Sequence, residues 1–475
     1  MNRNNIWIHL GLALIVVTVA AVLGQIDRWR SSLRPMMSET RDLARPVAKP
    51  TAIKRSPSDS EPEVLVRFKS GVTASQIEKL TAKFNDRVED RLELVNGLVA
   101  IDDLDNADPA EVAAHYARMT DLVEYAHENF IIEADIPDFT PVNDGHDMPR
   151  PNSPNDPHFA DQWGLSNDGR NGGKKGADIA ALSAWSKTKG SEDVVVAVLD
   201  TGVDYTHPDL VANMWVRPDS VPQYSDAQLG VINDLYGFNA GDNMADPMDD
   251  NGHGTHCAGI IGAEGDNGIG IAGINWNVKI MPLKFLGRGG FGSTKDAIEA
   301  INYAIDRKQN GVNVRVISAS WGSTMRSKAL EDAIRAAGEN GILFVAAAGN
   351  SSTDNDRRPH FPSNHDLPNV ISVAALDNGD LLASFSNYGS KSVHVAAPGK
   401  AIVSTWLKGS YREASGTSMA TPHVAGLAAL IIANEPDITM AELRKRILDS
   451  VDPLDILNGR IFSAGRINAD RALSN

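Results

Sequence analysis

Near-continuous apolar runs recur through the last two thirds of the chain, with amphipathic segments between them. Runs of this kind predict strands that are buried on both faces, as in a parallel sheet covered by helices. Helical periodicity appears at residues 296–308 and 328–340, and Gly341 marks the end of the second helix. The alternation predicts an α/β fold with a doubly wound, mostly parallel sheet, whose ligands lie beyond the carboxyl ends of the strands. The six predicted strands are residues 194–200, 278–286, 314–320, 342–350, 370–376 and 393–399.

A shorter alternating pattern comes before this region. Strand-like runs alternate with two helix-like segments, and Asn96-Gly97 marks a hairpin turn inside the second run. The order β-α-β-β-α-β predicts a small α+β domain of ferredoxin-like topology. The strand-like runs are residues 64–69, 91–102 and 123–134, and the helix-like segments are 75–84 and 109–119.

Apolar residues fill positions 6–24, interrupted by His9 and Thr18. As a helix this segment spans about 28 Å, close to the ~30 Å hydrocarbon core of a bilayer. The pattern predicts export, so that the rest of the chain is secreted, periplasmic or held at the membrane outside the cytoplasm. A cleaved signal peptide and a retained membrane anchor both stay open, because arginines cluster after the segment rather than before it.

Polar stretches rich in proline and serine separate these parts and predict linkers. The predicted organisation is a signal peptide or membrane anchor, a linker, the small domain, a second linker and the large domain, at residues 1–30, 31–62, 63–135, 136–154 and 155–475.

Composition removes several classes of function. The 45 basic and 61 acidic side chains give a net charge of −16, which argues against nucleic acid because phosphate binding needs a basic face. Cys257 is the single cysteine of the chain, so a disulfide framework and a cysteine-ligated zinc site are both excluded.

Three glycine-rich segments contain residue types that acyl transfer requires. Asp200 ends a predicted strand, His253 lies in NGHGTHCAG, and Ser418 lies in GTSMATPHVAG at the start of an apolar helix. Acyl transfer to water needs a nucleophile, a base that takes its proton, and a carboxylate that fixes the tautomer of the base. Taken singly, such residues usually cap helices and turns. Together they indicate a hydrolase.

These segments resemble the signatures of the subtilisin-like serine peptidases, thermitase-like members included, over about residues 155–475. The resemblance implies that Asp200 orients His253, that His253 is the general base and then the acid, and that Ser418 is the nucleophile of a serine endopeptidase. It also implies that Asn350, in AAAGN, and the backbone N–H of Ser418 form the oxyanion hole.

The same resemblance implies a pocket for the side chain before the cleaved bond. Because the segments that would line it supply no acid to pair with arginine or lysine, we expect broad cleavage after apolar residues. The implied lining segments are Ser320-Trp321-Gly322, Ala347-Ala348-Gly349 and Phe361-Pro362-Ser363.

The small domain resembles the inhibitory propeptide of this family, whose end occupies the active-site cleft after self-cleavage. The resemblance therefore implies a self-processed precursor that acts as a monomer, with protein or peptide substrates and its own propeptide as an intramolecular inhibitor.

Calcium is the implied cofactor, because EGDNGIGIAG (264–273) resembles the loop that binds structural calcium in thermitase-like members. A plain glycine-rich turn is the alternative. A second candidate site, Asn239, Asp242 and Asp246, has Met244 where related sequences often have an acid. The implied ligands of the first site are Asp156, Asp209, the side chain of Asn267 and the carbonyls of Glu264, Ile269 and Ile271.

Four other interpretations compete with the peptidase. The segment GRGGFG (287–292) fits a dinucleotide fingerprint, but no acid follows about 20 residues later. As part of a peptidase it is an edge that pairs with extended substrates. A metal cluster of His253, His256 and Cys257 lacks the glutamate of H-E-x-x-H, and GTSMA departs from the G-x-S-x-G elbow of lipases. An inactive binding protein on the same fold needs a reason that the sequence does not supply.

Overall fold

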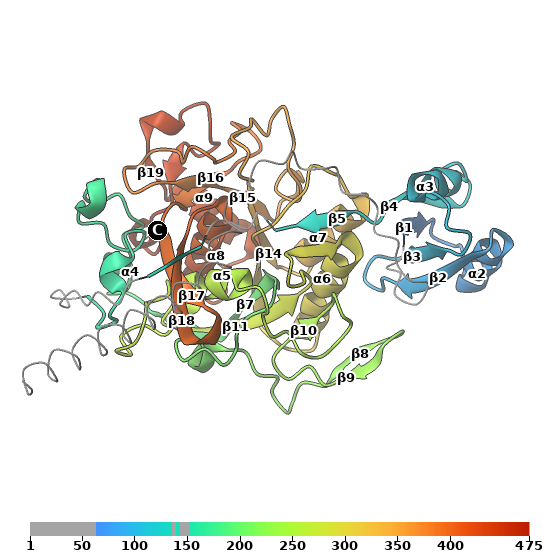
Figure 1. Cartoon of the computed structure of the whole chain (residues 1–475), viewed down its shortest axis with the longest axis horizontal. Coiled ribbons are helices and arrows are strands. Elements are labelled where there is room, and N and C mark those ends of the chain that lie inside the picture. Colours follow the sequence, from blue (N-terminus) through green and yellow to red (C-terminus); the bar gives the residue numbers. More distant parts are fainter. Residues whose placement is uncertain (1–62, 135–138, 143–152, 475) are drawn as a thin grey trace, which may run out of the picture. The chain divides into compact units, whose positions relative to one another are not determined.

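In the part of the chain that the structure describes, residues 63–134, 139–142 and 153–474, the apolar runs of the large domain form one nine-stranded sheet. This computed structural model has the strand order β10-β11-β7-β13-β14-β15-β16-β20-β19 (Figure 1). Neighbours from β10 to β20 run parallel, which confirms the predicted sheet, and β19 pairs antiparallel with β20. The strands are β7 (Gly190–Asp200), β10 (Phe238–Asn239), β11 (Asn277–Lys284), β13 (Val314–Ala319), β14 (Leu343–Ala347), β15 (Val370–Leu376), β16 (Val395–Pro398), β19 (Asp452–Pro453) and β20 (Gly465–Arg466).

Both faces of this sheet are covered by helices, which explains why its strands are apolar at nearly every position. On β7, Val196 and Val198 belong to the core that contains α5 and α8, whereas Ala197 and Leu199 belong to the core that contains α6 and α7. The helices are α4 (Ala181–Ala184), α5 (His253–Gly262), α6 (Thr294–Gln309), α7 (Lys328–Glu339), α8 (Thr417–Asn434), α9 (Met440–Asp449) and α10 (Ala469–Ala472).

The small domain is a four-stranded antiparallel sheet with the order β2-β3-β1-β4 and two helices on one face. Val64 and Val66 of β1 face those helices, whereas Leu65 faces the core that contains α6 and α7. Its elements are β1 (Val64–Phe68), α2 (Ala74–Lys83), β2 (Asp86–Arg91), β3 (Leu98–Asp103), α3 (Pro109–Ala117) and β4 (Val123–Glu128).

The prediction of a single strand over residues 123–134 is wrong. The chain leaves the small sheet after β4, and β5 (Ile131–Glu133) pairs antiparallel with β12 (Phe291–Ser293) of the large domain. Between the two strands, the carbonyl of Phe130 accepts from the backbone N–H of Thr294 at 2.9 Å. Contacts with the start of α6 therefore outweigh continuation of the strand.

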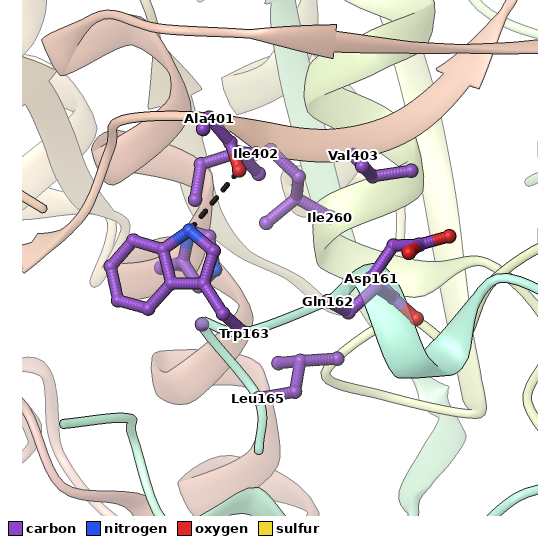
Figure 2. A pocket seen from close by; sticks show the side chains of 10 residues that line it. Asp161, Gln162, Trp163, Leu165, Ile260, Ala401, Ile402 and Val403 are labelled. Atoms are coloured by element: carbon purple, nitrogen blue, oxygen red, sulfur yellow. Dashed lines mark hydrogen bonds between the residues drawn. The ribbon is translucent and has the colours of Figure 1, made fainter. Parts of the chain in front are cut away.

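A three-stranded antiparallel sheet lies beside α5 and consists of β17 (Ile402–Trp406), β18 (Ser410–Ala414) and β6 (Thr140–Pro141). Figure 2 shows a small pocket below it, where Trp163 and Leu165 gather with Ile260 of α5 and Ile402 of β17. The indole N–H of Trp163 donates to the carbonyl of Ala401 at 3.1 Å, which ties the entry segment of the large domain to β17. A separate two-stranded hairpin, β8 (Tyr224–Asp226) with β9 (Gly230–Ile232), completes the sheets.

The predicted signal or anchor segment, residues 6–24, lies outside the described residues. Within those that are described, no helix has the length and apolar character needed to cross a bilayer.

Candidate active site

Asp200 and His253 meet at the carboxyl end of the central strand. Asp200 is the last residue of β7 and His253 is the first residue of α5, and both are fully buried. The imidazole Nδ1 lies 2.7 Å from the Asp200 Oδ1. Gly254 permits this approach, because a Cβ at that position would lie 2.1 Å from the carbonyl oxygen of Gly202. Gly254, the second glycine of the NGHGTHC motif, is therefore required because no side chain fits at this position.

Ser418 lies in the first turn of α8 and is buried. Its hydroxyl donates to the carbonyl of Ser320 at 3.1 Å, and the Ser320 hydroxyl donates back to the Ser418 carbonyl at 2.9 Å. The Cys257 thiol, one turn into α5, donates to the same Ser418 carbonyl at 3.5 Å. The starts of α5 and α8 are thus held together beside the end of β13.

Asn350 faces the residues just before Ser418. Its side-chain oxygen accepts from the backbone N–H and the hydroxyl of Thr417, at 2.8 and 2.9 Å. A Cβ placed on Gly416 would lie 3.3 Å from the Asn350 Nδ2 and 3.6 Å from the Ser418 nitrogen. The absent side chain of Gly416 therefore leaves a space that two N–H donors flank, as stabilisation of an oxyanion requires.

This arrangement can carry out nucleophilic acyl transfer. A hydroxyl, an imidazole fixed by a buried carboxylate, and two converging N–H donors are the parts that such a reaction uses. Of the sequence-predicted residues, Asp200 ends β7 and Asn350 follows β14 at the carboxyl edge of the parallel sheet, whereas His253 and Ser418 lie in the first turns of α5 and α8.

An extended segment of the chain already pairs with the edge of this site. Ile132 of β5 lies opposite Gly292 of β12, and Glu133 forms an antiparallel bridge with Gly322. The backbone N–H of Ala134 donates to the carbonyl of Gly290 at 2.8 Å. The glycine-rich segment 287–292 is thus an edge that pairs with an extended segment of the same chain.

Further along the chain, β6 pairs with β18, whose end leads into Ser418. The ring of Phe139 lies 6.5 Å from the His253 ring, centroid to centroid, and 4.1 Å from that of Trp406. The chain therefore contacts one side of the site through β5 and the other side through Phe139 and β6.

The residues expected to line a specificity pocket do not all present their side chains to it. Trp321 is 1% exposed, packs on Phe285 with ring centroids 4.8 Å apart, and donates its indole N–H to the carbonyl of Leu199 at 2.8 Å. Its side chain is a core residue, so only its main chain can face a substrate. Ser320 and Gly322 flank it on the same strand end, and Ala347 and Gly349 lie at the end of β14.

Sequence reasoning missed His360, which precedes the segment Phe361-Pro362-Ser363. A Cβ on Gly322 would lie 2.0 Å from the His360 Cε1, and one on Gly349 would lie 3.1 Å from the His360 Nε2. The signal in the sequence was a histidine directly before a segment already assigned to the pocket.

Two buried carboxylates, those of Asp156 and Asp209, contact the predicted calcium loop. Asp156 is 4% exposed and accepts from the backbone N–H of Asp266 at 2.8 Å, and Asp209 is 0% exposed and accepts from that of Ile271 at 2.9 Å. Burial raises the pKa of the Asp156 carboxyl to about 6. Burial, with the charge of Asp156 adding to it, raises the pKa of the Asp209 carboxyl to about 7.

The donor chemistry of this loop fits calcium. The side chain of Asn267 contacts the Asp209 Oδ1 at 2.9 Å. Within the described residues, no hydrogen bond reaches the main-chain carbonyls of Glu264, Ile269 and Ile271. Carboxylate, amide and carbonyl oxygens in this number are what Ca²⁺ takes. At the second candidate site, Asn239 donates to Asp242 at 3.0 Å, whereas Asp246 accepts from Tyr205.

Comparisons with known proteins agree with this geometry. A family model described as the subtilase family matches residues 191–466. The chain is 35% identical over 422 residues to a thermophilic serine proteinase of Bacillus sp. (strain AK1), a match that covers 87% of each chain. It is 35% identical over 322 residues to thermitase of Thermoactinomyces vulgaris, covering 68% of this chain and 99% of that protein. A solved protease structure from Pseudoalteromonas arctica PAMC 21717 is similar with a TM-score of 0.55 and 32% identity, covering 68% of this chain and 99% of that chain.

Proposed function

Because the chain belongs to the subtilase family and is a serine endopeptidase, we propose that it hydrolyses peptide bonds through a triad of Asp200, His253 and Ser418. The Ser418 hydroxyl attacks the carbonyl carbon while His253 takes its proton and then gives that proton to the leaving amine, which leaves an acyl-enzyme. Water that His253 deprotonates then attacks this acyl-enzyme, releases the carboxylic acid product and restores the Ser418 hydroxyl. Asp200 holds the imidazole in the required tautomer. The Asn350 amide and the Ser418 backbone N–H donate to the oxyanion. The 2.7 Å contact between His253 Nδ1 and Asp200 Oδ1 is the observation that carries the proposal.

Labelling with a fluorophosphonate, together with casein hydrolysis, tests this assignment. Ser418→Ala should abolish both, because the nucleophile is removed. Ser415→Ala is the matched control, since the Ser415 hydroxyl accepts from the Ala401 N–H at 2.9 Å and has no role in the triad. Labelling of Ser418→Ala at the rate of the parent protein would rule out Ser418 as the nucleophile.

The chain is also proposed to be made as a precursor that cleaves itself. The pairing of β5 with β12 and of β6 with β18 supports this, because the chain then contacts its own site as an extended peptide would. Full-length protein should accumulate in Ser418→Ala and be shortened when a trace of active enzyme is added. Conversion of pure Ser418→Ala without added enzyme would contradict self-cleavage by Ser418.

Export by residues 6–24 is proposed from their apolar pattern. Mass analysis of the N-terminus of the protein recovered from culture medium, membrane and cell interior tests it. Recovery of active enzyme from the cell interior alone would contradict it.

Calcium is proposed to bind at Asp156, Asp209, Asn267 and the carbonyls of Glu264, Ile269 and Ile271. The bound ion would supply positive charge to two buried carboxylates and link the entry segment of the domain to the loop after α5. This role is structural and takes no part in the bond-making steps.

A further inference from the structure

The segment that begins at His360 is joined by backbone hydrogen bonds to the residues that follow Ser320. Ser323 and Phe361 exchange two backbone hydrogen bonds of 2.7 Å. The backbone N–H of His360 donates to the Asn364 side chain at 3.0 Å. These bonds fix the position of His360 beside Gly322.

The imidazole of His360 occupies space that two glycines leave open. The Cβ position of Gly322 lies 2.0 Å from the His360 Cε1 and 2.6 Å from its Nε2. The Cβ position of Gly349 lies 3.0 Å from the His360 Cδ2 and 3.1 Å from its Nε2. A side chain at either glycine would therefore collide with the ring or press against it, so the ring fills the gap between the two main-chain segments.

This gap adjoins the reacting groups and the bound peptide. Gly322 pairs with Glu133, the strand before it ends at Ala319, and the carbonyl of the next residue, Ser320, accepts from the Ser418 hydroxyl. Gly349 directly precedes Asn350. A side chain of the peptide just before the attacked carbonyl must enter between these two segments, and it then meets the His360 ring.

A second donor lies in the same place. The Asn387 amide nitrogen is 2.5 Å from the Cβ position of Gly349 and donates to the Ala348 carbonyl at 2.9 Å. The Asn387 side-chain oxygen accepts from the backbone N–H groups of Ser351 and Thr353, which fixes the orientation of the amide. At this end of the pocket, the His360 ring therefore reduces the space left for a substrate side chain, and the Asn387 amide adds N–H groups.

We propose that His360 determines the specificity of this site by selecting a short side chain that carries an acceptor oxygen, aspartate above all, before the scissile bond. This inference rests on the proposed function, and it replaces the expectation of cleavage after apolar residues. A large apolar side chain has no room beside the ring, and it would displace water from these polar groups without offering them an acceptor in its place. In the sequence, the residue that follows Ala134 is Asp135.

A set of peptides that differ at the residue before the cleaved bond tests the proposal, using active enzyme obtained from the full chain. For wild type, kcat/KM should be at least about 10-fold higher with aspartate than with phenylalanine. His360→Gly should lose about 10–100-fold with aspartate, because a hydrogen bond to a charged group is removed, and should gain with phenylalanine. His360→Leu separates the two effects, since it fills the space without a donor and should lose activity towards aspartate without gaining any towards phenylalanine.

Met325→Ala is the matched control in the same segment. Met325 is an exposed residue two positions after Ser323 and has no role in the proposed site, so its loss should leave the ratio of aspartate to phenylalanine unchanged. Active enzyme whose ratio is the same in wild type, His360→Gly and His360→Leu would overturn the role of His360 and leave the triad intact. Failure of wild type to react with a fluorophosphonate would instead overturn the proposed function.

Discussion

At the scale of single residues, the side-chain oxygen of Asn350 is used by Thr417, which leaves its amide nitrogen next to the space above Gly416. Asn350→Ala should therefore lower kcat by about 10²–10³-fold with little change in KM, because the donor acts mainly in the transition state. Asn350→Asp keeps the acceptor for Thr417 but lacks the donor, and it should lose kcat as well. Steady-state kinetics of both variants decide the matter: a fully active Asn350→Asp would show that the amide nitrogen has no catalytic role.

Cys257 lies next to the His253 imidazole, as the helical spacing from His253 predicts. Its sulfur lies within 4.8 Å of ligand atoms of both Asp200 and His253, and the residue is 1% exposed. Burial raises the pKa of the Cys257 thiol, so the reactive thiolate is scarce. We expect an organomercurial to inactivate the wild type slowly and reversibly by thiol, since mercury on this sulfur displaces His253. Cys257→Ala should remain active and resistant; equal inactivation of both proteins would contradict this.

The sequence predicted the proposed triad but not the proposed role of His360, and the reason is physical. Asp200, His253 and Ser418 lie in local glycine-rich motifs whose glycines are needed for close approach, so their chemistry is visible in a short window. His360 reaches the pocket because Phe361 pairs with Ser323, 38 residues away by subtraction of their numbers. No local pattern contains that pairing.

At the scale of elements, the loop between α5 and β11 joins the entry segment of the large domain through Asp156 and Asp209. At a calcium concentration about 100 times the Kd, binding should raise the unfolding temperature of Ser418→Ala by about 3–4 °C, and chelator should reverse the effect. Asp209→Asn should flatten this dependence. Asp266→Asn, in the same loop but outside the proposed ligand set, should keep this dependence. An unfolding temperature that does not change when chelator is added would contradict calcium binding and indicate a plain glycine-rich turn.

The strands and helices themselves were largely predictable from the chain, because β7 and its neighbours are apolar on both faces and α6 and α7 are amphipathic. The exception is instructive. The run from Val123 was expected to continue to Ala134, yet it breaks so that β5 can join β12. A pattern of apolar residues predicts that a segment is extended, but the choice of partner strand depends on contacts made after folding.

At the scale of the whole molecule, several histidines are held neutral in the interior. Burial lowers the pKa of His256 and His394 to about 3 and that of His365 and His423 to about 4. A base whose folded pKa lies below its unfolded value of about 6.5 stabilises the fold above that pH, and this contribution is lost as pH falls towards the folded pKa. As pH falls below about 6.5, each such histidine lowers the free energy of unfolding by up to about 1.4 kcal/mol per pH unit. Four together lower it by up to about 5 kcal/mol per pH unit.

His394 offers the clearest test of this acid sensitivity. Its Nδ1 accepts the backbone N–H of Ser372 at 2.9 Å, and protonation would remove that acceptor. His394→Asn places an amide oxygen where Nδ1 lies and cannot take up a proton. In the Ser418→Ala background, which prevents autolysis, the free energy of unfolding measured by urea between about pH 7 and about pH 5 should fall less steeply in His394→Asn, by up to about 1.4 kcal/mol per pH unit. His115→Asn, on the exposed side of α3, should retain the full slope. If His394→Asn shows the slope of its parent, the buried imidazole is not a source of the acid sensitivity.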